Sequence, residues 1–249
     1  MHDNLKHGLP LSARIFSDSF IAGGCITSLF TRTPINDVDV YFNSERAFVQ
    51  GIRQACEDGM YCLHVSSRAV TFASGDDILQ LCKTVFSDTS DGIFDAFDFT
   101  CCMGAFNNKT KDFELHPDFL VHNSQRFLKF NPRTKYPIAS LLRVLKYQAK
   151  GYSIGQSEML KIALACRLPL IDSWEQFKEQ VGGSYGESVV LDSDGKDFSI
   201  DLALDLLSSS NLTFHRKLVE PPAGRSIEDV ADNILDLMGY NPAESPSGK

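Results

Sequence analysis

The sequence predicts an α+β fold, in which a mixed β-sheet with flanking helices is followed by a mostly α-helical C-terminal part. Three observations support this prediction. The 249 residues are 43% hydrophobic and 22% charged, which is the composition of an ordinary globular protein. Short apolar or β-branched runs alternate with helical segments up to about residue 125, and from Pro137 onward the apolar residues recur at helical spacing. We therefore predict one domain over residues 1–125 and a helical domain with a polar C-terminal tail over residues 126–249.

The first half contains the elements of the predicted sheet. Gly23-Gly24 ends the first apolar run and opens a helix, and Ser44 is placed as the N-cap of a second helix that runs to about Glu57. A short helix is predicted over residues 90–97. The predicted strands cover residues 18–22, 38–42, 60–65, 69–73, 78–86, 97–106 and 113–115.

The second half contains most of the predicted helices. Pro137 suits a first helical turn, because the N–H that proline lacks would be unsatisfied there. After Pro221-Pro222, Ser226 and Asp229 form the pattern of a capping box before a last amphipathic helix. The other predicted helices cover residues 157–167, 173–181 and 199–208.

Composition excludes several classes of protein. No apolar run approaches the roughly 18–20 residues that a membrane-spanning helix needs, so we predict no membrane association. The N-terminal residues lack the apolar stretch of a secretory signal. The seven cysteines contain no C-x-x-C pair, and their odd number prevents complete disulfide pairing. We therefore predict a reduced, cytoplasmic protein.

The charge is unevenly distributed along the chain. The net charge is −8, yet residues 119–157 contain no Asp or Glu. This basic segment carries a charge of +7, so the rest of the chain carries −15 (−8 minus +7). Its cations are Arg126, Lys129, Arg133, Lys135, Arg143, Lys146 and Lys150. Such a segment is suited to bind a polyphosphate or a nucleic-acid strand, although a solvated basic surface gives the same pattern.

The segment NDVDVYF carries the strongest chemical signal. Asp37 and Asp39 are two residues apart at a predicted strand, where side chains at i and i+2 point to the same face. Their carboxylates repel each other unless a cation is present, and hard oxygen ligands of this kind bind Mg²⁺ or Mn²⁺. A second D-x-D, formed by Asp192 and Asp194, lies in a DSDGKD turn and is expected to be structural.

Gly23-Gly24 places the start of a helix shortly before the first D-x-D. The unpaired N–H groups and the positive dipole end of a helix N-terminus can bind a phosphate. A third carboxylate is expected on a neighbouring strand, and Asp98 in FDAFDFTCC is the candidate. Asp95 is the competitor, but it falls in the portion that favours a helix or a turn.

The predicted helix that begins at Pro137 has two faces. At 100° per residue one face carries Arg143, Lys146, Tyr147 and Lys150, and three aligned cations are suited to phosphate groups. The opposite arc, which we expect to be buried, carries Ile138, Leu141, Leu142, Leu145, Ala149 and Tyr152. The cations before this helix alternate with Phe127, Phe130 and Tyr136. That alternation suits a single nucleic-acid strand, and it equally suits core residues between domains.

The segment IAGGCITSLFTRTPINDVDVYF resembles the signature of the head domain of CCA-adding enzymes and bacterial poly(A) polymerases. These enzymes belong to the DNA polymerase β-like nucleotidyltransferase superfamily. The thirteen-residue step from Gly24 to Asp37 is the same as in the family pattern, which reads approximately GGxVRDxLLGRxxxDxD. RVLKYQAKGY similarly resembles the family's basic helix, RxLRFAxRxGF. Thr27 and Ser28 replace the arginine and the acid of the pattern, and no EDxxR base-reading segment is found.

The resemblance implies a nucleotidyltransferase-type sheet and a metal-dependent transfer of NMP from an NTP (ATP or CTP) to an acceptor hydroxyl, with release of pyrophosphate. It implies that Asp37, Asp39 and Asp98 bind Mg²⁺ or Mn²⁺ as the catalytic residues. The residues implied to bind the nucleotide are Gly23, Gly24, Arg32, Arg143 and Lys146. The acceptor expected first is an RNA or tRNA 3′ end. The alternatives are nucleotidylation of a protein or small molecule, and a catalytically dead nucleotide-binding module.

Overall fold

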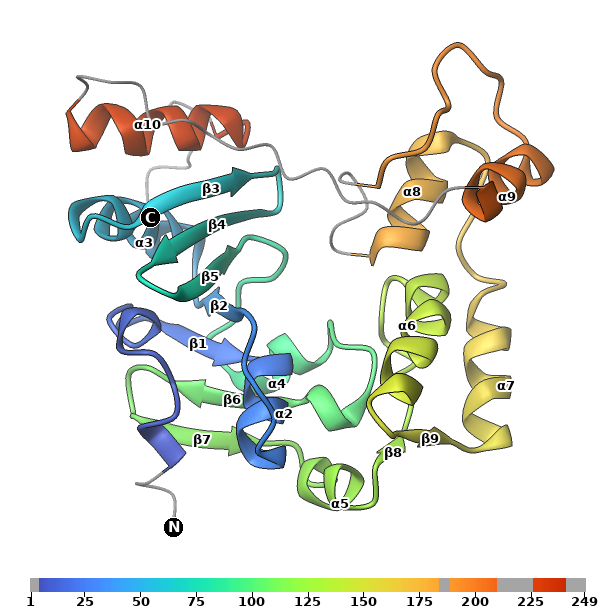
Figure 1. Ribbon diagram of the computed structural model, residues 1–249, viewed down its shortest axis with the longest axis horizontal. Coiled ribbons are helices and arrows are strands. Elements are labelled where there is room, and N and C mark those ends of the chain that lie inside the picture. The colour runs from blue at the N-terminus through green and yellow to red at the C-terminus, as the bar shows by residue number, and fades with distance from the viewer. Residues whose placement is uncertain (1–4, 184–188, 210–225, 241–249) are drawn as a thin grey trace. The chain divides into compact units, whose positions relative to one another are not determined.

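The computed structural model describes residues 5–183, 189–209 and 226–240 (Figure 1). These residues form two compact units. The first unit comprises the described parts of 1–93, 105–114 and 217–249, and the second comprises those of 94–104 and 115–216. This division differs from a single boundary after residue 125, because helix α10 (Ile227–Leu237) packs on helix α3 (Glu45–Glu57) of the first unit. There the guanidinium of Arg53 lies 2.7 Å from the carboxylate of Asp232.

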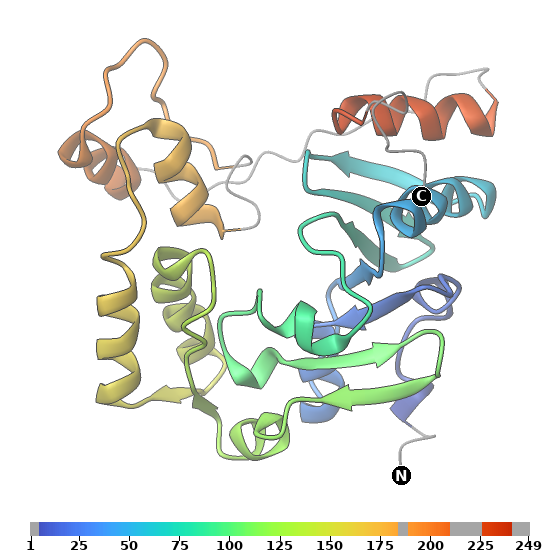
Figure 2. The ribbon, with the colours of Figure 1, turned by 180° about the vertical axis from the view of Figure 1, so that it is seen from behind.

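The first unit is built on a mixed sheet, which for the described residues has the strand order β3-β4-β5-β2-β1-β6-β7. The strands are β1 (Ser19–Ala22), β2 (Val38–Phe42), β3 (Tyr61–Val65), β4 (Ala69–Ser74), β5 (Asp77–Cys82), β6 (Gly104–Asn107) and β7 (Asp112–Leu115). Strand β2 runs parallel to β5 and antiparallel to β1. Figure 2 shows β6 and β7 side by side at one edge of this sheet. The predicted mixed sheet with flanking helices is confirmed.

Strand β2 has one core face and one half-buried face. Val38, Val40 and Phe42 are at most 1% exposed, whereas Asp39 alternates with them and is half-buried. Helix α3 packs beside β2, and the rings of Phe42 and Phe48 meet edge to face with centroids 5.6 Å apart. The side chain of Ser44 accepts a hydrogen bond from the N–H of Ala47, so the predicted N-cap is correct. The apolar face of β2 is thus packed in the core, and the face that carries Asp39 stays partly accessible.

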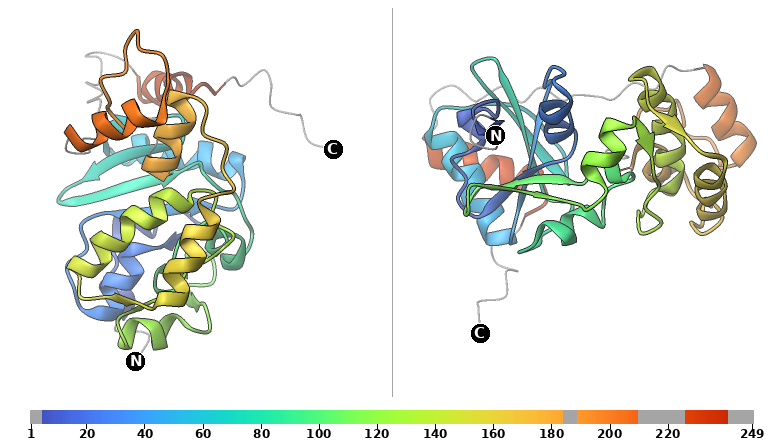
Figure 3. Two further views of the ribbon diagram at one scale, coloured as in Figure 1. Left: turned by 90° about the vertical axis from the view of Figure 1, so that its right-hand side faces the viewer. Right: turned by 90° about the horizontal axis from the view of Figure 1, so that it is seen from below.

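The second unit is mostly helical, as predicted. Its helices are η2 (Thr100–Cys102), α5 (Phe119–Ser124), α6 (Pro137–Ala149), α7 (Gln156–Ala165), α8 (Trp174–Gly182) and α9 (Ile200–Ser209). Strands β8 (Phe127–Leu128) and β9 (Ser153–Ile154) pair in parallel. Figure 3 shows α6 and α7 side by side, and their contact encloses a core that contains Val144 and Ile162. The remaining described helices are η1 (Leu11–Ala13), α2 (Gly24–Thr31) and α4 (Ser90–Phe94).

The strand predicted over residues 97–106 is only partly correct. Phe99 makes a single bridge to Phe130, and the chain then turns through η2 before strand β6 begins at Gly104. The turn closes by local bonds, since the N–H of Cys102 donates to the carbonyl of Phe99. The sulfur atoms of Cys101 and Cys102 lie 3.9 Å apart in this turn.

The predicted faces of helix α6 are also partly wrong. Leu141 is 37% exposed and Leu145 is 67% exposed, although both belong to the arc expected to be buried. Tyr147 lies instead against the core that contains Val144. The cause is a polar partner on the inner side of the helix, which turns Arg143 inward and is described below.

No helix in the described part of the chain combines the length and the apolar composition that crossing a membrane requires.

Candidate active site

The D-x-D and the glycine turn lie side by side in the first unit. The antiparallel register of β1 and β2 places Ala22 opposite Asp39. Gly23 follows Ala22 directly, and Asp37 precedes β2 by one residue. The start of helix α2 (Gly24–Thr31) is therefore adjacent to the start of the D-x-D strand. Residues separated by a helix and a loop in the sequence thus meet at one end of two paired strands.

The glycine turn has a backbone that favours glycine and an open approach. Gly23 has φ 86° and ψ −136°, a conformation that side-chain-bearing residues rarely adopt. A Cβ atom added to Gly24 would meet no atom within 4 Å, and Gly24 is exposed. No side chain caps the helix, and its first turn holds no acidic residue. The start of α2 therefore has the features that suit an anion.

Two carboxylates beside this turn affect the same neighbouring thiols electrostatically. Asp37 is exposed and Asp39 is half-buried. Burial raises the pKa of the Cys25 thiol, and the charges of Asp39 and Asp37 raise it further. Burial also raises the pKa of the Cys82 thiol, again with Asp39 and then Asp37 adding to the effect. The two carboxylates therefore create a negative potential at the end of β2, of the sign that a cation neutralises.

The donor set fits a divalent cation bound together with a phosphate ligand. Two carboxylates supply hard oxygen atoms, and Mg²⁺ is commonly held by one or two carboxylates together with phosphates of a substrate. Among the described residues, no Lys or Arg forms an ion pair with Asp37. The same residues contain no group of three His, Cys, Asp or Glu side chains that could hold a metal without such a ligand. Asp37 and Asp39 are the residues that would hold the cation.

On the strands beside β2, no carboxylate is the register partner of Asp39. Ala22 of β1 and Gln80 of β5 are the register partners of Asp39. Asp98 lies in a bend of the second unit and belongs to no strand of the sheet. The prediction that Asp98 lies on a strand of the sheet is therefore wrong. Its metal-binding and catalytic role stays a prediction.

Asp98 is instead the centre of a polar network in the second unit. It is 7% exposed. Its Oδ1 accepts hydrogen bonds from Ser140 at 2.7 Å and from Thr134 at 3.2 Å, and its Oδ2 accepts one from the guanidinium of Arg143. Ser140 and Arg143 are on helix α6, one turn apart, so both reach the same carboxylate. This network is the polar partner that turns Arg143 inward.

The remaining predicted nucleotide ligands are spread over both units. Arg32 is exposed and forms the left-handed C-cap of α2, about 12 Å along the helix from the glycine turn. Lys146 is exposed on α6. Arg143 is in the network with Asp98. The structure thus brings together Gly23, Gly24, Asp37 and Asp39, and the nucleotide-binding roles of the other residues stay predictions.

Part of the basic segment is neutralised within the second unit. Lys129 lies 2.9 Å from the carboxylate of Asp118, and Arg133 lies 2.5 Å from that of Asp95. Phe130 is 4% exposed and packs on Phe99, so it is a core residue. A single nucleic-acid strand would have to displace these acidic partners before it could pair its phosphates with the two cations.

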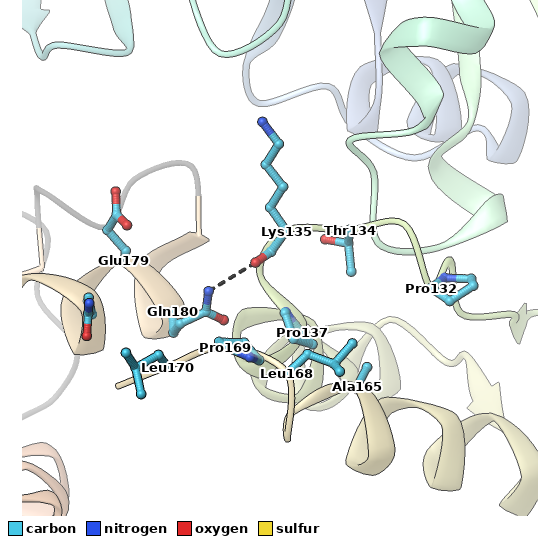
Figure 4. Close-up of a pocket in the computed structure, with 11 residues that line it drawn as sticks. Pro132, Thr134, Lys135, Pro137, Ala165, Leu168, Pro169, Leu170, Glu179 and Gln180 are labelled. Atoms are coloured by element: carbon cyan, nitrogen blue, oxygen red, sulfur yellow. Dashed lines mark hydrogen bonds between the residues drawn. The ribbon is translucent and has the colours of Figure 1, made fainter. Parts of the chain in front are cut away.

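A cavity of about 410 Å³ lies in the second unit among helices α6, α7 and α8 (Figure 4). Pro132, Pro137 and Pro169 are among the residues that line it. The Nε2 atom of Gln180 donates to the carbonyl of Lys135 at 3.0 Å, while the ammonium of Lys135 extends away from the prolines (Figure 4). The cavity is therefore mainly apolar and does not offer the anion-binding groups found at the glycine turn.

Comparisons with solved structures concern the fold. Solved structures of CCA-adding enzymes superpose on the chain: the Thermotoga maritima enzyme complexed with tRNA has TM-score 0.53 at 11% identity, covering 72% of this chain and 48% of that one. A CCA-adding enzyme complexed with ATP has TM-score 0.54 at 11% identity, with the same two coverages. The fold is nucleotidyltransferase-like.

Sequence comparison adds a second relationship. Residues 3–126 match the model of the Gabija anti-defense 2 family. A protein named Gabija anti-defense 2, from Bacillus phage SPbetaL7, is 38% identical over 224 residues, which are 89% of this chain and 56% of the relative. The chain therefore spans little more than half of the length of that relative. It also spans about half of the length of the CCA-adding enzymes.

Sequence reasoning missed Gln80 as a neighbour of the D-x-D. In the segment DILQLC, Gln80 stands between Leu79 and Leu81, which predicts that Gln80 points away from the core. Its register against Asp39 depends on a crossover pairing of β2 with β5, and no local pattern specifies that pairing.

Proposed function

We propose that this protein is a metal-dependent nucleotidyltransferase. The observation that carries the proposal is the register of β1 and β2, which sets Asp37 and Asp39 beside the uncapped start of α2. Anion-binding N–H groups next to a pair of carboxylates suit a triphosphate with its divalent cation. The nucleotidyltransferase-like fold of the neighbours supports the same reaction class.

The chemistry follows from these groups. The N–H groups after Gly23 bind phosphate oxygens and orient the triphosphate, and Asp37 and Asp39 hold the divalent cation. When bound, the cation neutralises phosphate charge and polarises the α-phosphoryl group. The acceptor hydroxyl oxygen forms a bond to the α-phosphorus, the bond from that phosphorus to the bridging oxygen breaks, and pyrophosphate leaves. The hydroxyl proton passes to solvent.

The acceptor that we favour is a component of a bacterial defence system. The relative is named for counteracting the Gabija defence, and the chain covers 56% of that relative. A binding surface for single-stranded RNA is not favoured in the basic segment, because Lys129 and Arg133 form ion pairs and Phe130 is buried. In this reading the transfer of a nucleotide to a defence component blocks that component by adding bulk and negative charge.

An RNA 3′ end is the second candidate acceptor. Lys146 on α6 and Lys150, the C-cap residue of this helix, are exposed and suited to contact phosphates. The tRNA complex of a CCA-adding enzyme among the structural neighbours favours the same candidate. A nucleotide-binding module without catalysis is the remaining alternative.

Label transfer distinguishes these candidates. The protein is incubated with each α-³²P-labelled NTP and Mg²⁺ or Mn²⁺, together with either total RNA or a lysate that contains the Gabija proteins. Labelling of a defence protein supports the favoured acceptor, and labelling of RNA supports the second candidate. Absence of any labelled macromolecule and of pyrophosphate release, in a preparation that still binds NTP, would identify a binding module and refute the transferase proposal.

A further inference from the structure

Gln80 occupies the position beside the D-x-D at which a third charged ligand would stand. Strands β2 and β5 are parallel, and Asp39 and Gln80 are register partners. Register partners on neighbouring strands present their side chains on the same face, about 4.8 Å apart. Gln80 is half-buried, like Asp39, and the residues on either side of it, Leu79 and Leu81, are fully buried. The amide is therefore on the chemical face of the sheet.

Asp39 and Gln80 belong to a row of register partners that crosses the sheet. The next position in this row, on β4, is also polar and uncharged. Thr71 of β4 is the register partner of Gln80, so it lies two strands from Asp39. On the other side of Asp39, Ala22 offers no ligand atom. Gln80 is thus the adjacent position in this row that can place a polar atom beside the carboxylates.

An amide differs from a carboxylate at this position in charge and in donor capacity. Its oxygen is a neutral hard ligand for a divalent cation, while its NH₂ group can donate to a phosphate oxygen. With Gln80 the site carries two negative charges, and a glutamate would give it three. A lower charge weakens the attraction for a free cation, and it also weakens the repulsion of a triphosphate.

We propose that Gln80 is the third polar group of the metal site and keeps its affinity for free cation low, so that cation and nucleotide bind together. The inference rests on the proposed function, since it takes Asp37 and Asp39 as the carboxylates that hold the cation. The amide contacts the cation through its oxygen or the triphosphate through its NH₂ group, and both contacts couple the two ligands. Nucleotide therefore raises the affinity for the cation, and cation raises the affinity for nucleotide.

The test measures Mn²⁺ binding to the full chain by electron paramagnetic resonance of the free ion, with and without a non-hydrolysable ATP analogue. Gln80→Glu is compared with Thr71→Glu, which adds the same charge one strand farther away. Gln80→Glu is expected to bind free Mn²⁺ about tenfold more tightly, because it adds a charged oxygen ligand. Thr71→Glu is expected to change the affinity by about twofold at most, because distance and salt screen its charge.

Coupling to the nucleotide supplies a second readout. The analogue is expected to raise the Mn²⁺ affinity of the wild-type chain, and this increase should shrink in Gln80→Glu. Gln80→Leu, which is close in size but has no polar atom, is expected to retain folding and to lose most of the increase. Thermal unfolding of each variant establishes that it is folded before binding is measured.

The outcomes separate this inference from the proposed function. Equal effects of Gln80→Glu and Thr71→Glu, or wild-type coupling in Gln80→Leu, would overturn the role of Gln80 and leave the D-x-D site standing. Mn²⁺ binding to the wild-type chain that Asp39→Asn leaves unchanged would refute the metal site itself, and with it the proposed function.

Discussion

Replacing Arg143 by Met is expected to destabilise the second unit by about 2–3 kcal/mol. The change removes the guanidinium that pairs with Asp98 and retains an apolar stem of similar length. Loss of one partner from a fully buried pair costs about 3–5 kcal/mol, because the remaining charge is buried without compensation. The Asp98 side chain is 7% exposed but that of Arg143 is 36% exposed, so water screens part of this penalty. Ser140 and Thr134 keep their hydrogen bonds to Asp98, and these bonds lower the free-energy penalty further.

Arg133→Met is the matched control. Arg133 pairs with Asp95 in the same unit, but these side chains are 71% and 52% exposed, so the expected loss is about 0–1 kcal/mol. Urea unfolding of both variants can be followed by the fluorescence of Trp174, which is the single tryptophan of the chain and lies in this unit. The Arg143→Met effect should persist in 1 M salt, because burial limits screening. A loss no larger than that of Arg133→Met would refute the account of Asp98 as a buried structural centre.

Three further predictions concern the glycine turn, the thiols and pH. Gly23→Ala is expected to lower the free energy of unfolding by about 1–3 kcal/mol, because φ 86° is strained for alanine. Gly24→Ala should fold normally but bind ATP more weakly in calorimetry, since its methyl group enters the space through which a phosphate reaches the helix start. Of the seven cysteines, half-buried Cys166 is expected to react first with a thiol reagent at pH 8, and Cys166→Ser should remove the fastest phase seen by absorbance. Burial lowers the pKa of His122, with Asp118 opposing and Lys129 and His116 adding to the shift. Its neutral form is therefore favoured on folding, so that stability is present above the unfolded pKa near 6.5 and is lost as pH falls. His122→Gln should reduce the change in the urea midpoint between pH 7 and pH 5. A change as large as that of the wild-type chain would contradict this prediction.

The elements around the D-x-D could be predicted from the sequence because local signals dominate there. Residues 38–42 are β-branched or aromatic except for Asp39, and the structure places β2 over the same residues. Ser44 caps α3, which ends at Glu57 as predicted. The capping box formed by Ser226 and Asp229 is also present. Each of these features depends on contacts within a few residues, which a sequence pattern records.

The errors arise where distant residues decide the structure. Helical periodicity placed Arg143 on a solvated face, but Asp98, 45 residues earlier in the chain, holds it on the inner side. A similar sequence distance separates Asp39 from Gln80, which the pairing of β2 with β5 brings to its side. The sequence predicts one strand over residues 97–106, whereas pairing of Phe99 with Phe130 forms a single bridge there and a 3₁₀ turn follows it. Long-range pairing of this kind is set by the whole fold.

The central claim is that Asp37 and Asp39 support nucleotidyl transfer, and pyrophosphate release measures it most directly. The assay compares the wild-type chain with Asp39→Asn and with Asp194→Asn, which makes the same change in the other D-x-D. Asp194 is exposed in a turn, in which the ammonium of Lys196 donates hydrogen bonds to the carbonyl and the carboxylate of Asp192. We expect the wild-type chain and Asp194→Asn to release pyrophosphate at similar rates and Asp39→Asn to lose at least about 100-fold, because a removed metal ligand costs several kcal/mol of transition-state stabilisation. Equal rates in all three folded proteins would contradict the claim.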